Sequence, residues 1–178
     1  MTITETEIAM IFFKRNFKSV DEAWPHIYNK LKGMLGKSYP FEIEDEEEAK
    51  TMLTFAVISI EIQNLKKFFP DQSERILNKF IKIINSLEEG DYINEKIAIY
   101  TDKVKESYKQ HEENERYSIF EEVSVQLMQD WFGDNVSKFY VRNTEVVNPL
   151  IIGLITLFLI SLTDFWEKNK DNLVIIKD

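Results

Sequence analysis

The sequence predicts an all-α protein, and three observations carry this prediction. Glycine and proline are scarce, with 5 and 4 copies in 178 residues, whereas an all-β chain needs many turns. Polar residues that start helices recur along the chain, and apolar residues follow them at helical spacing. Short connections between successive segments favour antiparallel neighbours. We therefore expect an antiparallel helical bundle of about six to eight helices, which forms one domain over residues 1–178.

Start and stop signals divide the chain into individual helices. Asn148 precedes a proline, which starts a helix without losing a hydrogen bond. Glycines fall where several helices should end. Four side chains stand three residues before a glutamate, the pattern of a capping box: Thr4, Ser19, Asp71 and Ser118. The expected helices cover residues 5–18, 20–35, 45–68, 72–88, 91 to about 108, 119–132 and a segment that begins at 149, with a short helical turn after 134.

The sequence at each end of the chain is compatible with either a helix or a strand. Residues 8–13 (IAMIFF) and 173–177 (LVIIK) are rich in β-branched and aromatic side chains, which strands favour. We expect a helix for the first segment and a strand for the second, and two strands there could pair. Residues 170–178 form a tail, and residues 1–36 either join the bundle or pack as a separate hairpin.

Residues 146–166 are the most hydrophobic stretch of the chain. A bilayer span needs about 20 mostly apolar residues, and the uninterrupted run from Leu150 to Leu162 is shorter. Basic residues stand on both sides of it, so the flanks indicate no membrane orientation. A helix that is apolar all round suits the middle of a bundle. We expect this C-terminal helix to be the central one, with a protein contact or a membrane span as the alternatives.

Composition limits the cell compartments and the classes of partner that suit this protein. The net charge of -9 and the pI of about 4.9 argue against nucleic acid as a partner, because an acidic surface repels phosphate. The absence of cysteine excludes disulfides and thiolate chemistry and is compatible with a reducing compartment. The first residues lack the features of a secretory signal. We expect a cytoplasmic protein.

Motifs for catalysis, cofactors and metals are missing. The histidines, His26 and His111, do not follow a glutamate at the spacing of a di-iron bundle. No glycine-rich phosphate loop and no nucleophile elbow occurs. We therefore expect no catalytic residue, no cofactor and no metal ligand.

Glu61 is the residue that departs most from its surroundings. It stands between Ile60 and Ile62 and shares a helix face with apolar residues, which is unfavourable for a charge. A buried carboxylate must pair, bind a ligand or take up a proton. Glu61, with Asn64 one turn along, is our candidate ligand-binding site; the residues proposed to face it are Tyr140, Arg142 and Asp164.

An acidic run precedes and opens the helix that contains Glu61. Its candidate partner-binding residues are Glu44, Glu46, Glu47 and Glu48, which would meet a basic protein. The simpler interpretation is a solvated helix start that complements the helix dipole.

Two functions follow from these observations. The leading one is a non-catalytic cytoplasmic protein–protein interaction module, such as an adaptor, a regulatory subunit or an immunity or antitoxin protein, that binds another protein or its own copy. The alternative is a ligand- or metal-binding bundle, including an enzymatic version, built around Glu61.

Overall fold

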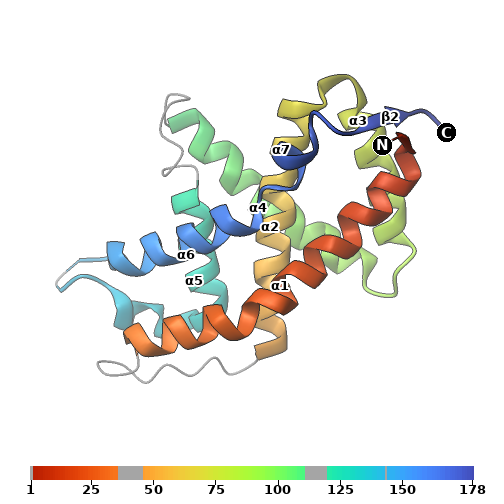
Figure 1. Cartoon of the computed structure of the whole chain (residues 1–178). Helices are drawn as coiled ribbons and strands as arrows, with labels where there is room; N and C mark the ends of the chain where they lie inside the picture. The colour runs from red at the N-terminus through yellow and green to blue at the C-terminus, as the bar shows by residue number, and fades with distance from the viewer. Residues whose placement is uncertain (1, 36–45, 111–119, 143) are drawn as a thin grey trace.

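The computed structural model of this chain describes residues 2–35, 46–110, 120–142 and 144–178, and it is a helical bundle (Figure 1). In chain order the elements are β1 (Thr2–Thr4), α1 (Glu5–Leu35), α2 (Glu46–Phe68), α3 (Pro70–Asn85), α4 (Gly90–Gln110), α5 (Glu121–Phe132), the 3-10 helix η2 (Gly133–Phe139), α6 (Pro149–Leu162), α7 (Phe165–Asn169) and β2 (Val174–Ile176). The prediction of an all-α bundle is confirmed.

α2 lies at the centre of the bundle. Every residue from Met52 to Ile62 is buried, and α2 packs against α1, α3, α4, α5, α6 and α7. A helix that is apolar on nearly every face suits such a position, because each face meets a different neighbour. Figure 1 shows α2 in the middle of the fold, with α1 crossing it and α6 extending to one side.

The position expected for the C-terminal helix needs a correction. α6 packs against α1, α5 and α2 along one side, where Ile151, Ile155 and Leu159 are buried. On its other side Leu150 is 72% exposed and Leu157 is 55% exposed. The amphipathic helices already have α2 as their common partner, so α6 is covered on one face only.

α1 is one helix of 31 residues where the sequence predicted two. The Ser19 hydroxyl donates to the Asn16 carbonyl and does not cap a new helix. The reason is a continuous buried stripe at spacings of three and four, which crosses the expected break: Ile8, Phe12, Asn16, Val20, Trp24, Ile27 and Leu31. Burial of this stripe outweighs the helix-breaking tendency of Pro25, which lies inside α1 and is exposed.

Three of the four expected capping boxes, those of Thr4, Ser19 and Asp71, lie among the described residues, and Ser118 lies outside them. The Thr4 backbone N–H donates to the Glu7 carboxylate at 2.9 Å, and the Glu7 N–H donates to the Thr4 hydroxyl at 3.2 Å, as expected. Asn148 accepts from the Leu150 N–H at 3.0 Å, also as expected. α3, by contrast, begins at Pro70 and has no side-chain cap, so the start predicted from Asp71 was late.

The ends of the chain meet in a two-stranded parallel pair. Thr2 pairs with Val174 and Thr4 with Ile176, which places the termini side by side (Figure 1). The strand predicted in the C-terminal segment and the helix predicted for residues 8–13 are both confirmed. The N-terminal strand lies before that helix, and the last residue, Asp178, contacts Thr6 and forms an ion pair with Lys79.

Candidate functional site

Glu61 connects the central helix to the junction between α6 and α7. Its side chain is 0% exposed, and one carboxylate oxygen accepts the Phe165 backbone N–H at 2.7 Å. The other oxygen accepts the side-chain amide of Asn64 at 3.2 Å. The same amide donates to the Thr163 carbonyl at 3.2 Å. The two sequence-predicted site residues therefore lie together, and both contact the residues that follow α6.

A pair of opposite charges lies beside this carboxylate. Arg15 of α1 donates to Asp164 at 3.0 Å, and its guanidinium lies over the Phe165 ring, 4.9 Å from the centroid. Burial raises the pKa of Glu61 to about 7, opposed by the hydrogen bonds from Phe165 and Asn64 and by the Arg15 charge. Asp164 adds to the rise because it is also negative.

Sequence reasoning identified part of this cluster. Asp164 lies at the site, as proposed, whereas Tyr140 pairs with Val147 in an isolated bridge at the other end of α6. Arg142 is exposed on the same segment as Tyr140. Arg15 was missed, because its pairing with a residue 149 positions away leaves no pattern in the sequence. Little signal for this residue was available, because Arg15 stands between Lys14 and Asn16 in a polar part of α1.

The chemistry open to this cluster is restricted by its packing. A carboxyl group with a pKa near 7 can exchange a proton at neutral pH, but a general acid or base must reach its substrate. Both oxygens of Glu61 are occupied by protein donors, and the side chain is closed to solvent. Within the part of the chain that the structure describes, no three acidic or histidine side chains converge as a metal site. The geometry gives Glu61 a structural contact, and the ligand-binding interpretation stays a prediction.

The acidic run at the start of α2 is partly used inside the molecule. Glu46 accepts the indole N–H of Trp24 at 2.7 Å. Glu47 forms an ion pair with Lys50 at 2.6 Å, and this contact raises the pKa of the lysine. The first contact links the start of α2 to α1, and the second lies within the first turn of α2. Glu48 is exposed, and Glu44 lies outside the described residues.

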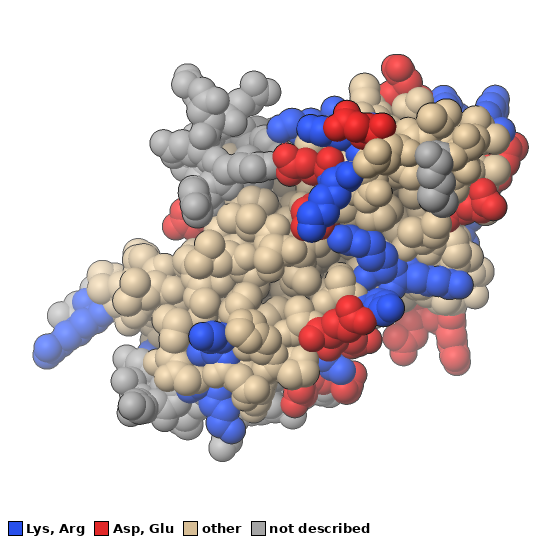
Figure 2. Space-filling model, in the orientation of Figure 1, with Lys and Arg blue, Asp and Glu red and all other residues tan. Residues whose placement is uncertain are grey.

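The exposed side of α6 is an apolar surface. We define the α6 face as the residues on that side that are exposed or half-buried: Leu150, Gly153, Leu154, Leu157, Phe158 and Ser161. No charged side chain occurs in the 14 residues of α6. Figure 2, which looks onto α1 and α6, shows a wide uncharged area bordered by charged side chains.

By length and composition, α6 and α7 together are the one segment among the described residues that could cross a membrane. Pro149–Asn169 covers 21 residues, and half of its most apolar part is buried in the fold. α6 itself ends at Leu162, so its 14 residues rise about 21 Å against the roughly 30 Å of a bilayer core. This is weak evidence for a span, and the fold is compatible with a soluble protein.

Comparison with known proteins gives no relative for this arrangement. No family model matches the chain, and neither curated proteins nor solved structures gave a match. The functional argument therefore rests on the geometry of the chain itself.

Proposed function

We propose that this protein is a non-catalytic protein-interaction module whose contact surface is the α6 face. The observation that carries the proposal is the exposure of Leu150 and Leu157, 72% and 55%, on a helix without charge. Soluble monomers rarely expose contiguous apolar patches larger than a few hundred Å². Removing such side chains from water favours association by roughly 25 cal/mol for each Å² buried.

The spacing along the α6 face supports packing against another helix. Leu150, Leu154, Leu157 and Ser161 recur at intervals of four, three and four, which is the spacing of a seam between paired helices. A Cβ atom added at Gly153 would meet nothing within 4 Å. A side chain of a partner helix can therefore approach the backbone at this point.

The partner that fits this face is a second copy of the chain. In an antiparallel pair about a two-fold axis, each α6 covers the same residues of the other, and the helix dipoles oppose. Residues 137–148 carry two basic and one acidic side chain, a net charge of +1. Residues 163–172 carry three acidic and two basic side chains, a net charge of -1. Antiparallel pairing brings these oppositely charged ends together.

A cytoplasmic location and an adaptor or regulatory role belong to the same proposal. The absence of cysteine supports a reducing compartment. The missing catalytic motifs support a role in binding rather than in chemistry. The acidic residues at the start of α2 are weaker candidates for the contact surface than the α6 face, because Glu46 and Glu47 already have partners within the chain.

Light scattering on a sizing column tests the proposal over a range of protein concentrations. We expect the mass to rise from the 21.1 kDa of one chain toward twice that value. Leu157→Glu should weaken association at least roughly a hundredfold, because a two-fold interface loses the apolar contact twice. Leu87→Glu, at a position 38% exposed between α3 and α4, is the matched control and should associate like the wild type.

Two results would contradict the proposal. One is a wild-type mass that stays at the single-chain value up to millimolar concentration. The other is a Leu157→Glu protein that associates as strongly as the control. A wild-type monomer that binds lipid vesicles through α6 would replace the protein partner with a membrane surface.

A further inference from the structure

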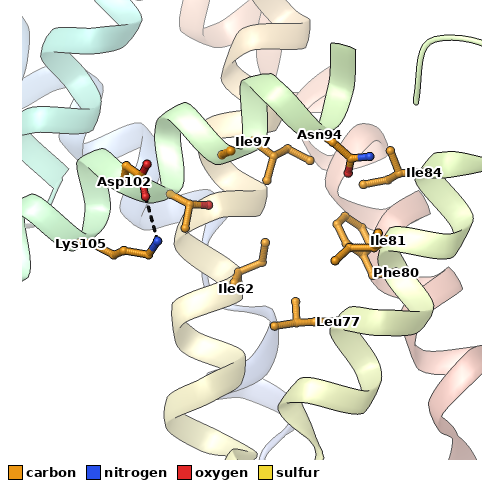
Figure 3. A pocket seen from close by; sticks show the side chains of 11 residues that line it. Ile62, Leu77, Phe80, Ile81, Ile84, Asn94, Ile97, Asp102 and Lys105 are labelled. Atoms are coloured by element: carbon orange, nitrogen blue, oxygen red, sulfur yellow. Dashed lines mark hydrogen bonds and ion pairs between the residues drawn. The ribbon is translucent and has the colours of Figure 1, made fainter. Parts of the chain in front are cut away.

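A cavity between α2, α3 and α4 is a second feature without an assigned role, and it is separate from the α6 face (Figure 3). Its volume of about 410 Å³ lies within the range of small-molecule sites, roughly 300–1,000 Å³. Ile62 of α2, Phe80 of α3 and Ala98 of α4 each contribute to its walls. The walls are therefore mostly apolar and come from three helices.

The turn between α3 and α4 lies at one end of the cavity. At Gly90 the two helices are so close that an added Cβ would lie 2.6 Å from the Ile84 carbonyl oxygen. Beside this turn the Asn94 side chain donates to Asn85 at 2.6 Å. Figure 3 shows Asn94 and Ile84 near this end and Asp102 and Lys105 at the opposite end. The cavity thus extends between the helices from their shared turn toward Asp102 and Lys105.

The end at Asp102 and Lys105 is polar and contains one unsatisfied group. The hydroxyl oxygen of Thr101 is buried and has no hydrogen-bond partner within the described part of the chain. A buried hydroxyl without a partner is unfavourable, and an occupant with a polar group would supply one. Lys105 and Asp102 form an ion pair at 2.8 Å beside it, and both side chains are more than half exposed.

We propose that this cavity binds a small uncharged amphipathic molecule with an apolar body and one hydroxyl-like head. At about 30 Å³ for each atom in a liquid, the volume holds roughly a dozen heavy atoms. The apolar walls cover the body, and the head lies against Thr101, Asp102 and Lys105. Because the two charges at the rim cancel, an ionised head gains no net attraction there. A hydroxyl can both donate to the carboxylate and accept from the hydroxyl or the ammonium group.

Titration of the isotope-labelled protein with n-octanol, followed by amide NMR, tests the proposal. We expect saturable shifts confined to α3, α4 and the neighbourhood of Ile62, with a Kd of roughly a millimolar or tighter. Octanoate, which differs in its ionised head, should bind about tenfold more weakly. Shifts that do not saturate, or that map to the α6 face, would overturn the proposal.

Two variants separate the cavity from the rest of the fold. Ala98→Leu fills the cavity from an exposed position of α4 and should abolish n-octanol binding while the spectrum keeps its native dispersion. Thr101→Val removes the hydroxyl at constant shape and should weaken n-octanol binding about fivefold. Thr51→Val is the control, because its hydroxyl donates to the Glu47 carbonyl away from the cavity. Undiminished binding by Ala98→Leu, or equal binding by both threonine variants, would refute the assignment. Both outcomes are independent of association through α6.

Discussion

The buried carboxylate of Glu61 predicts a specific dependence of stability on pH. Glu61→Gln replaces the acid with a neutral side chain of the same shape that can still accept the Phe165 N–H. The wild-type side chain must be ionised at high pH inside the protein, whereas the variant never carries this charge. The difference in unfolding free energy between the two proteins therefore reports on Glu61 alone, since all other groups titrate in both.

The direction and size follow from the pKa of about 7 in the folded chain, against 4.5 for an ordinary glutamate. Because the folded pKa is raised, the folded state binds the proton more tightly. The stability that this provides is fully present below about pH 4.5 and is lost as the pH rises through 7. The difference between the two pKa values corresponds to about 3 kcal/mol. Arg15 and Asp164, the charged groups that face Glu61, act in opposite directions and are retained in both proteins.

Urea unfolding followed by tryptophan fluorescence measures this difference, since Trp166 lies directly after Phe165 in the chain. The variant should gain about 3 kcal/mol relative to the wild type between roughly pH 4.5 and pH 8. A difference that stays constant over this range would show that Glu61 does not titrate there, and the argument from its burial would fail.

Two further comparisons test the packing of the helices. Gly90→Ala should lower the unfolding free energy by about 1–3 kcal/mol, because the new Cβ meets the Ile84 carbonyl. Gly33→Ala has open space around the new Cβ and should raise the unfolding free energy by about 0.5–1 kcal/mol. Equal effects of the two substitutions in urea unfolding would contradict this. Glu46→Ala should cost about 1–2 kcal/mol, because it leaves the Trp24 indole N–H without its acceptor, and Glu46→Gln should restore most of this loss. Equal calorimetric Tm values for the two Glu46 variants would show that the hydrogen bond from Trp24 does not stabilise the fold.

Local sequence signals predicted the fold class well because they act over a single helix turn. The capping box at Thr4, the Asn148 cap and the apolar stripes are all read from neighbouring residues. The same reliance on local signals divided α1 in two. Ser19 and Pro25 resemble a helix start. However, packing of the buried stripe against α2 and α3 stabilises one continuous helix more than a new helix start would stabilise two.

The candidate site was predicted as far as a single helix allows. The apolar neighbours of Glu61 indicate its burial, and helical spacing places Asn64 beside it. The partners from outside α2 were not foreseeable in this way. Phe165 contributes a backbone N–H, which has no sequence signature, and the Arg15 pairing joins two distant helices. The sequence likewise could not show that α6 is covered on one face only, because hydrophobicity alone does not reveal which faces of an apolar helix are covered.

The α6 face can be tested most directly by a single introduced cysteine, because the natural chain has none. Leu157 lies within the exposed stripe, where an antiparallel pair brings each residue near the two-fold axis close to its own copy. Under mild oxidation, Leu157→Cys should form a covalent dimer rapidly, since a disulfide requires Cα atoms within about 7 Å. Leu87→Cys should form no covalent cross-link on the same timescale, although it still associates through α6. Equal rates of cross-linking at the two positions would contradict the account of α6 as the contact surface between copies.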